Sequence, residues 1–222
     1  MKNLEHDLDK LQRDILRLAT SVEEAITGAI GSLIGRDEDL ADEIIDGDAD
    51  IDNLSNAIEE ECLRILALYQ PVAKDLRRVS TVSMINTDLE RMADLAGSVA
   101  GRAKAMMEAP PIPVPARLSE MTDLVIQIVH LSVDSFVTMN AEQARAVIRR
   151  DDEVDQLNDI IIHEIVALMK RSPAAIEPAL SLFSAVRHLE RIADHATNIA
   201  EDVVFLVEGN RIRHHPEAIE AD

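Results

Sequence analysis

The 222-residue sequence is poor in aromatic residues and cysteine, and both shortages limit the structures that it can form. Aromatic residues make up 2% of the chain and tryptophan is absent, so the interior must be built from aliphatic side chains and methionine, as in helix bundles. The single cysteine, Cys62, excludes an intramolecular disulfide and fits a reducing compartment. The sequence has no apolar run near the roughly 20 residues of a membrane span, and segment 1–9 is polar. We therefore expect a soluble, cytoplasmic protein.

Positive charge is also scarce, since 22 lysine and arginine residues face 42 aspartate and glutamate residues, for a formal net charge of −20. Such a chain repels nucleic-acid phosphates and anionic lipids, so we expect neither nucleic-acid binding nor direct membrane insertion. It can attract metal cations or basic protein surfaces. The alternative is that the charge only keeps long exposed helices in solution.

Apolar residues recur at intervals of three and four along most of the chain, which predicts an all-α fold. We expect six long helices, with Asp37, Asn140 and Ser172 as N-caps and proline near the start of the third and sixth helices. The expected helices cover residues 3–35, 38–69, 71–108, 117–138, 141–170 and 173–208. A proline-rich segment separates them into a first three-helix bundle (1–109), a linker (110–116), a second three-helix bundle (117–208) and a mobile tail (209–222).

The second half of the sequence resembles the first when the chain is shifted by about one hundred residues. This shift aligns Asp48 with Asp151 and Asp52 with Asp155, and with a small adjustment it aligns Glu90 with Glu190. Two tandem three-helix bundles related by internal duplication are therefore expected.

One phrase is repeated almost unchanged, as L-E-R-M-A-D in residues 89–94 and L-E-R-I-A-D in residues 189–194. On a helix, Glu90 lies beside Asp94 and Glu190 lies beside Asp194, so each phrase puts two like charges on one face. Either basic neighbours or a bound cation must compensate for their repulsion.

Other acidic residues extend both pairs at helical spacing. Asn198 continues the row of Glu190 and Asp194, and His163 continues the row of Asp151 and Asp155. Carboxylate and amide oxygens suit Mg²⁺, Mn²⁺ and Fe³⁺, whereas an imidazole would suit Zn or Fe. The competing interpretation is a set of ordinary ion pairs within one helix, such as Arg187 with Glu190 and Arg191 with Asp194.

The chain resembles the PhoU family, the accessory regulators of phosphate-specific transport. The resemblance rests on Q-P-V-A-K-D-L-R (70–77), N-T-D-L-E-R-M-A-D (86–94) and H-L-E-R-I-A-D-H-A-T-N-I-A-E (188–201), and it covers nearly all of the chain except the tail. It implies two three-helix bundles with multinuclear metal clusters. The expected ligands are Glu90, Asp94, Glu190, Asp194 and, from the other acidic rows, Asp48, Asp52, Asp151, Asp155 and Asn198.

The resemblance also implies a function. It predicts a metal-binding, non-enzymatic negative regulator of the phosphate (Pho) regulon that contacts the ATPase subunit of a phosphate ABC transporter and a sensor histidine kinase. It further implies a homodimer, held at the inner face of the membrane through these partners. The expected cofactor is a divalent or trivalent metal ion, and the sequence leaves its identity open among Fe, Zn, Mg and Mn. Because Ser98 stands where the second half has Asn198, the first site is expected to be weaker or to bind a different number of metal ions.

Two alternatives from other functional classes remain at this stage. One is an enzyme that uses metal bound in a carboxylate-rich bundle for hydrolysis or oxidation, which would require an open coordination position. The other is a metal-free helical interaction module whose acidic rows are only solvated.

Overall fold

The computed structural model describes residues 2–210 and 212, and it confirms the all-α fold. Three long helices form the first half and four helices, with one short 3₁₀ helix, form the second. Their bounds are α1 Lys2–Gly35, α2 Glu38–Tyr69, α3 Ala73–Glu108, α4 Arg117–Thr138, α5 Ala141–Ile148, α6 Asp151–Arg171, η1 Pro173–Ala175 and α7 Ile176–Glu208.

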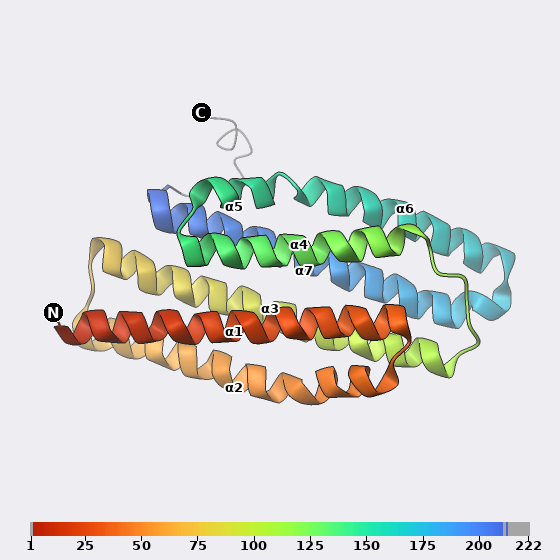
Figure 1. Ribbon diagram of the computed structural model, residues 1–222, viewed down its shortest axis with the longest axis horizontal. Helices are drawn as coiled ribbons and strands as arrows, with labels where there is room; N and C mark the ends of the chain where they lie inside the picture. The colour runs from red at the N-terminus through yellow and green to blue at the C-terminus, as the bar shows by residue number, and fades with distance from the viewer. Residues whose placement is uncertain (1, 211, 213–222) are drawn as a thin grey trace.

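The helices form two elongated bundles that lie side by side (Figure 1). Helices α1, α2 and α3 pack together as the first bundle, and α4 and α7 pack with the consecutive pair α5 and α6 as the second. The most extensive contact between any two helices is between α3 and α7, one from each bundle. The two helices that carry the repeated phrase therefore form the centre of the molecule.

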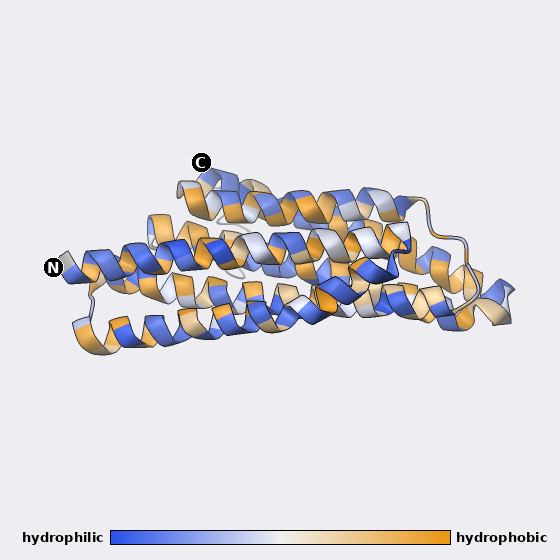
Figure 2. Ribbon diagram, turned by 60° about the horizontal axis from the view of Figure 1, so that its bottom comes forward, coloured by the Kyte–Doolittle hydropathy of each residue, from blue (hydrophilic) through white to orange (hydrophobic). Residues whose placement is uncertain are grey.

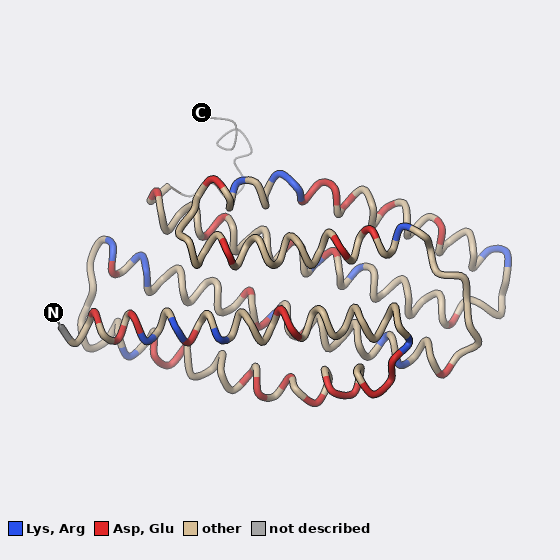
Figure 3. Tube along the Cα trace, viewed as in Figure 1, with Lys and Arg blue, Asp and Glu red and all other residues tan. Residues whose placement is uncertain are grey.

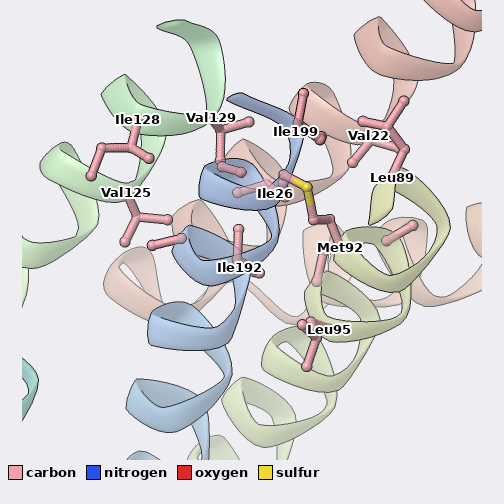
Figure 4. Packing of buried hydrophobic residues seen from close by; sticks show 14 of the residues in the cluster. Val22, Ile26, Leu89, Met92, Leu95, Val125, Ile128, Val129, Ile192 and Ile199 are labelled. Atoms are coloured by element: carbon pink, nitrogen blue, oxygen red, sulfur yellow. The ribbon is translucent and has the colours of Figure 1, made fainter. Parts of the chain in front are cut away.

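The helices pack through their apolar faces, and orange and blue residues alternate around the ribbons accordingly (Figure 2). A single cluster of buried residues runs through both bundles. Side chains from α1, α3, α4 and α7 meet in it, among them Ile26, Met92, Val129 and Ile192 (Figure 4). Leu89 and Leu189 of the repeated phrase are also buried, so its apolar positions hold the core while its acidic positions turn outward.

Three helix ends follow the local signals that the sequence contains. The side chain of Asp37 accepts a hydrogen bond from the amide of Leu40 at 3.0 Å, and Asn140 caps α5 in the same way. Gly209 ends α7 in the left-handed conformation, with φ of 82°.

The predicted helix over 141–170 is interrupted, because Arg149 and Arg150 form a turn between α5 and α6. The amide of Arg150 donates to the carbonyl of Val147, three residues earlier, and its guanidinium donates to Gln127 on α4 at 3.1 Å. The tighter turn and this tertiary contact break the helix at a place without glycine or proline. Gly47 occupies the matching position of the first half, where α2 continues unbroken.

Two other boundaries differ slightly from the expectation. Helix α3 begins at Ala73 rather than at Pro71, because its N-cap residue Val72 is extended; Gln70 ends α2 in a left-handed conformation. Pro173 begins the 3₁₀ turn η1, and α7 itself begins at Ile176. Of the expected mobile tail, residues 211 and 213–222 lie outside the described residues, while Ile212 is buried. Among the described helices, none is both long enough and apolar enough to cross a membrane.

Candidate metal centre

The first acidic cluster lies between α2 and α3, where the two antiparallel helices bring their acidic residues together. Asp48 and Asp52 come from α2 and Asp94 comes from α3, and one carboxylate oxygen of each lies within 4.8 Å of the others. Glu90 lies one turn before Asp94 and is electrostatically coupled to all three. The structure therefore gathers the four carboxylates of the first half that the sequence singled out.

Burial and like charges raise the pKa of two members of this cluster. The pKa of Asp48 is raised by desolvation and then by the nearby carboxylates of Asp52 and Asp94. The pKa of Glu90 is raised by desolvation against the opposing effect of Arg91. The guanidinium of Arg91 lies 3.1 Å from Asp94 and 3.5 Å from Glu90, but its side chain is 56% exposed. One solvated arginine leaves most of the negative charge of four carboxylates uncompensated.

The second acidic cluster lies between α6 and α7, and it consists of Asp151, Asp155, Glu190 and Asp194. Desolvation, together with the charges of Asp194 and Asp155, raises the pKa of Asp151 to about 6. Desolvation also raises the pKa of Asp194, with further contributions from Glu190 and Asp155. The charges of these four carboxylates act on one another across α6 and α7. They are less closely gathered than the first cluster, because among the described residues only Asp48, Asp52 and Asp94 bring carboxylate oxygens within 4.8 Å of one another.

Only one of the two carboxylate oxygens of Glu190 in the second cluster has a hydrogen-bond partner among the described residues. Its Oε1 atom accepts a hydrogen bond from Arg187 at 3.0 Å, so this predicted intrahelical ion pair is present. Its Oε2 atom is buried and has no hydrogen-bond partner among the described residues. Its pKa is raised, mainly by desolvation and against the effect of Arg187. A buried carboxylate oxygen without a partner is costly, and a bound cation would relieve that cost.

The donor set fits a hard cation. Both clusters offer carboxylate oxygens from two facing helices, and such oxygens suit Mg²⁺, Mn²⁺ and Fe³⁺. The described contact of His163 is between its Nδ1 atom and the backbone oxygen of Asp159 at 2.7 Å, on an exposed stretch of α6. The imidazole that would have favoured Zn therefore points to its own helix in this structure.

Helical spacing predicted that Asn198 would face the second acidic cluster, but in the structure Thr197 contacts that cluster and Asn198 contacts α3. The amide of Asn198 donates to Oδ1 of Asp88 on α3 at 3.3 Å, in the contact between the bundles. The hydroxyl of Thr197 instead donates to Oδ1 of Asp151 at 3.3 Å. Thr197 lies three residues after Asp194, a spacing that also puts it on the face of the acidic row. Sequence reasoning followed only the four-residue spacing to Asn198 and therefore missed Thr197.

The surface around the first cluster is strongly acidic. Red residues follow α2 along its length, whereas blue residues are fewer and lie near the start of α3, in the first half of α1 and at several helix ends (Figure 3). The acidic residues of α2 that lie outside the cluster include the exposed pair Asp46 and Asp50, which has the same spacing as Asp48 and Asp52. Charge alone therefore does not distinguish the site; the facing carboxylates of α3 do.

Comparison with known proteins agrees with the resemblance seen in the sequence. The family model described as the PhoU domain matches twice, over residues 15–103 and 118–203. The two matched segments correspond to the two bundles, as an internal duplication predicts.

Similar proteins cover most of this chain. A protein of Aquifex aeolicus called "Phosphate-specific transport system accessory protein PhoU homolog" is 38% identical over 208 residues, covering 94% of both chains. The Escherichia coli protein "Phosphate-specific transport system accessory protein PhoU" is 30% identical, covering 94% of this chain and 86% of that protein. The crystal structure of PhoU from Pseudomonas aeruginosa superimposes with a TM-score of 0.89 at 35% identity, covering 93% of this chain and 99% of that one.

Proposed function

The chain belongs to the PhoU family, and on this premise we propose that it is a metal-binding regulatory adaptor of phosphate uptake. Relatives that are 30–38% identical carry names that make them accessory proteins of the phosphate-specific transport system. A solved relative from Streptococcus pneumoniae, 29% identical, is called a phosphate transport system regulatory protein. These names support an accessory and regulatory role for this chain.

The observation that carries the metal-binding part is the presence of two matching carboxylate clusters, one per bundle. Each combines an Asp-x-x-x-Asp pair on one helix with a Glu-x-x-x-Asp pair on a neighbouring helix. In the first, Asp48, Asp52 and Asp94 bring carboxylate oxygens within 4.8 Å of one another, and in the second the charges of Asp194 and Asp155 raise the pKa of Asp151. Carboxylates that repel one another and are partly desolvated destabilise the bundle unless something neutralises them. Bound cations would supply that positive charge and tie α2 to α3 and α6 to α7.

We place the regulatory action in the protein's binding surfaces rather than in catalysis. The adaptor contacts the ATPase subunit of a phosphate ABC transporter and a sensor histidine kinase, and it restrains the phosphate regulon when phosphate is sufficient. It acts as a homodimer in the cytoplasm, at the inner face of the membrane. The cations fix the helix pairs in the arrangement that the partners recognise.

The proposal is tested by metal content and partner binding measured on the same preparations. Elemental analysis compares metal-replete wild type with the variants Glu90→Gln/Asp94→Asn and Glu190→Gln/Asp194→Asn. Each variant should lose the metal of one cluster and retain the other. Binding to the transporter ATPase and to the kinase should weaken when the wild type is stripped of metal and recover when metal is restored.

A matched control removes the same charge from the same surface. Asp46→Asn/Asp50→Asn changes an exposed pair on α2 with the same spacing, and it should leave the metal content unchanged. Wild type that holds no metal above a protein-free buffer blank would contradict metal binding and leave the helical interaction module. If the wild type instead turned over a substrate and the cluster variants lost this activity, the result would support the metal-dependent enzyme.

A further inference from the structure

A groove of about 520 Å³ lies between α1 and α2, and every residue that lines it belongs to one of these two helices. It extends from Leu40 to Leu54 along α2 and from Arg17 to Gly28 along α1, so at about 1.5 Å per residue it is about 16–21 Å long. Helix α3 packs against both helices but contributes no residue to the lining. Figure 1 shows α2 along the edge of the molecule opposite to α5 and α6. The groove therefore lies on the outer side of the first bundle.

The floor of this groove is apolar and its rim is acidic. Ile51 is buried, and Ile44 and Leu54 are half-buried against the core. The exposed charged residues of the lining are three carboxylates and one guanidinium, namely Glu24, Glu43, Asp50 and Arg17. An apolar floor inside a mainly negative rim is complementary to an amphipathic helix that carries basic residues beside its apolar row. Such a helix can pack along the groove between two helices as a further member of the bundle.

Gly47 lies in the middle of α2 and lines the groove. A glycine inside a helix is less favourable than alanine, so its presence needs a reason. Gly28 on α1 has such a reason within the bundle, because a Cβ atom there would overlap Cδ1 of Ile44. A Cβ atom at Gly47 would lie more than 4 Å from every other described helix, so the packing of the bundle does not require glycine at this position. The open space instead allows another molecule to approach α2 closely.

The second bundle has the corresponding groove with a side chain across it. The shift of about one hundred residues that relates the two halves aligns Gly47 with Arg150 and Glu24 with Gln127. Arg150 and Gln127 both line a cleft between α4 and α6, and the guanidinium of Arg150 donates to Oε1 of Gln127 at 3.1 Å. The first bundle has a carboxylate in place of this amide acceptor and no side chain in place of the guanidinium. Its groove is therefore open where the second groove holds a cation of its own.

We propose that the groove between α1 and α2 is the docking site for a basic amphipathic helix of a partner protein. The apolar row of that helix packs on Ile44 and Ile51, and one lysine or arginine lies over Gly47 and reaches Glu24. This basic residue takes the place that Arg150 has in the second bundle. The inference rests on the proposed adaptor function and assigns one surface of the protein to it. A second copy of this chain is a poorer occupant, because it also carries a net charge of −20.

The test uses a fluorescein-labelled peptide of about 18 residues, or five helical turns, as the probe. Its leucines recur at intervals of three and four, and lysines flank them on the helix surface. A second peptide has the same composition in scrambled order, so it keeps the charge and loses the apolar row. In fluorescence anisotropy, the wild type should bind the amphipathic peptide at least about 10-fold more tightly than the scrambled one.

Two substitutions at Gly47 close the groove. Gly47→Leu fills it with an apolar side chain, and Gly47→Arg copies the second bundle. Each should weaken binding of the amphipathic peptide by about 10-fold or more. Neither should lower the temperature of thermal unfolding, because leucine and arginine form helices better than glycine. Gly101→Leu is the matched control, since Gly101 lies inside α3 and a Cβ atom there is also more than 4 Å from every other described helix. This variant should bind the peptide as the wild type does.

Equal affinity for the two peptides would reduce the binding to charge attraction and overturn the inference. Gly47 variants that bind the amphipathic peptide as tightly as Gly101→Leu would also contradict it, and both results leave the proposed function to its own test. A homodimer in sedimentation that Gly47→Arg dissociates would assign the groove to a second copy of the chain instead. If the wild type binds the peptide in this groove but binds neither the transporter ATPase nor the kinase, the proposed function fails and the inference stands.

Discussion

The Nδ1 atom of His195 on α7 lies 2.8 Å from Oδ1 of Asp88 on α3, 107 residues earlier in the chain. The same oxygen of Asp88 accepts a hydrogen bond from the amide of Asn198. Asp88 is 8% exposed, so this contact is a nearly buried polar link in the middle of the α3–α7 packing. Because α3 and α7 each carry one of the repeated phrases, the link fixes the two acidic clusters relative to each other.

Replacing Asp88 with alanine should therefore destabilise the junction between the bundles. The change leaves His195 and Asn198 without their shared acceptor, and we expect the free energy of unfolding to fall by about 1–3 kcal/mol in urea denaturation. Asp123→Ala, at an exposed position on α4, should change it by less than about 0.5 kcal/mol. An Asp88 variant as stable as the Asp123 variant would show that the link contributes nothing to the junction.

The sequence allowed the fold to be predicted because its signals are local and repeated. The periodicity of apolar residues, the caps Asp37 and Asn140 and the terminating Gly209 each act within one helical turn. The break at Arg149–Arg150 was missed because its causes include the contact with Gln127 on α4, which no local pattern reveals.

The same distinction holds for the candidate site. The four-residue spacing of the carboxylates fixed which residues share a helical face, and the duplication showed which faces correspond. The direction of Asn198 toward Asp88, and of Thr197 toward Asp151, depends on how α7 is rotated between α3 and α6. That rotation is set by the packing of the whole core.

The metal-free protein should become less stable as the pH rises through the range from about 4 to 6. A carboxyl group whose pKa is raised in the folded state, such as Asp151 with a pKa of about 6, holds its proton longer there than in the unfolded chain. Between the two pKa values the folded state binds more protons, so the free energy of unfolding falls with increasing pH. Urea denaturation at a series of pH values, in the presence of a chelator, measures this slope.

Asp151→Asn should remove part of that slope and stabilise the metal-free protein at pH 7 by about 1–2 kcal/mol, because the amide carries no charge to desolvate. Asp159→Asn, at an exposed position further along α6, is the control and should leave the slope unchanged. In the presence of saturating metal the order should reverse, since Asp151 then loses a favourable contact. A slope that is equally steep in both variants would mean that Asp151 is not the titrating group.

The apolar position that varies within the repeated phrase should matter for stability and little for metal binding. Met92 is fully buried among residues of α1, α3 and α7, so Met92→Ala leaves a cavity and should cost about 2–5 kcal/mol. Leu68→Ala, at a side chain that is 65% exposed, should cost less than about 0.5 kcal/mol. Chemical denaturation measures both. If the two costs were similar, the core would not be centred where α3 and α7 meet.

Asn198 and Thr197 allow the expectation from helical spacing to be tested directly against the observed contacts. Asn198→Ala removes a donor to Asp88, and we expect a loss of about 1 kcal/mol in the free energy of unfolding with unchanged Mn²⁺ affinity at the second cluster. Thr197→Val removes the hydrogen bond that lowers the pKa of Asp151, so this carboxyl should protonate more readily. The Mn²⁺ affinity of the Thr197→Val variant should then fall most clearly near pH 6, where protons compete with the metal for Asp151.

Isothermal titration with Mn²⁺ at pH 6 and pH 7.5, in the Glu90→Gln/Asp94→Asn background, separates the two side chains. The Thr197 variant should weaken binding more at the lower pH, because only there does the protonation of Asp151 limit the site. The Asn198 variant should match its parent at both values. If Asn198→Ala instead lost as much affinity as Asp194→Asn, its amide would be a metal ligand, as the spacing of Glu190, Asp194 and Asn198 first indicated, and its contact with Asp88 would have to give way when metal binds.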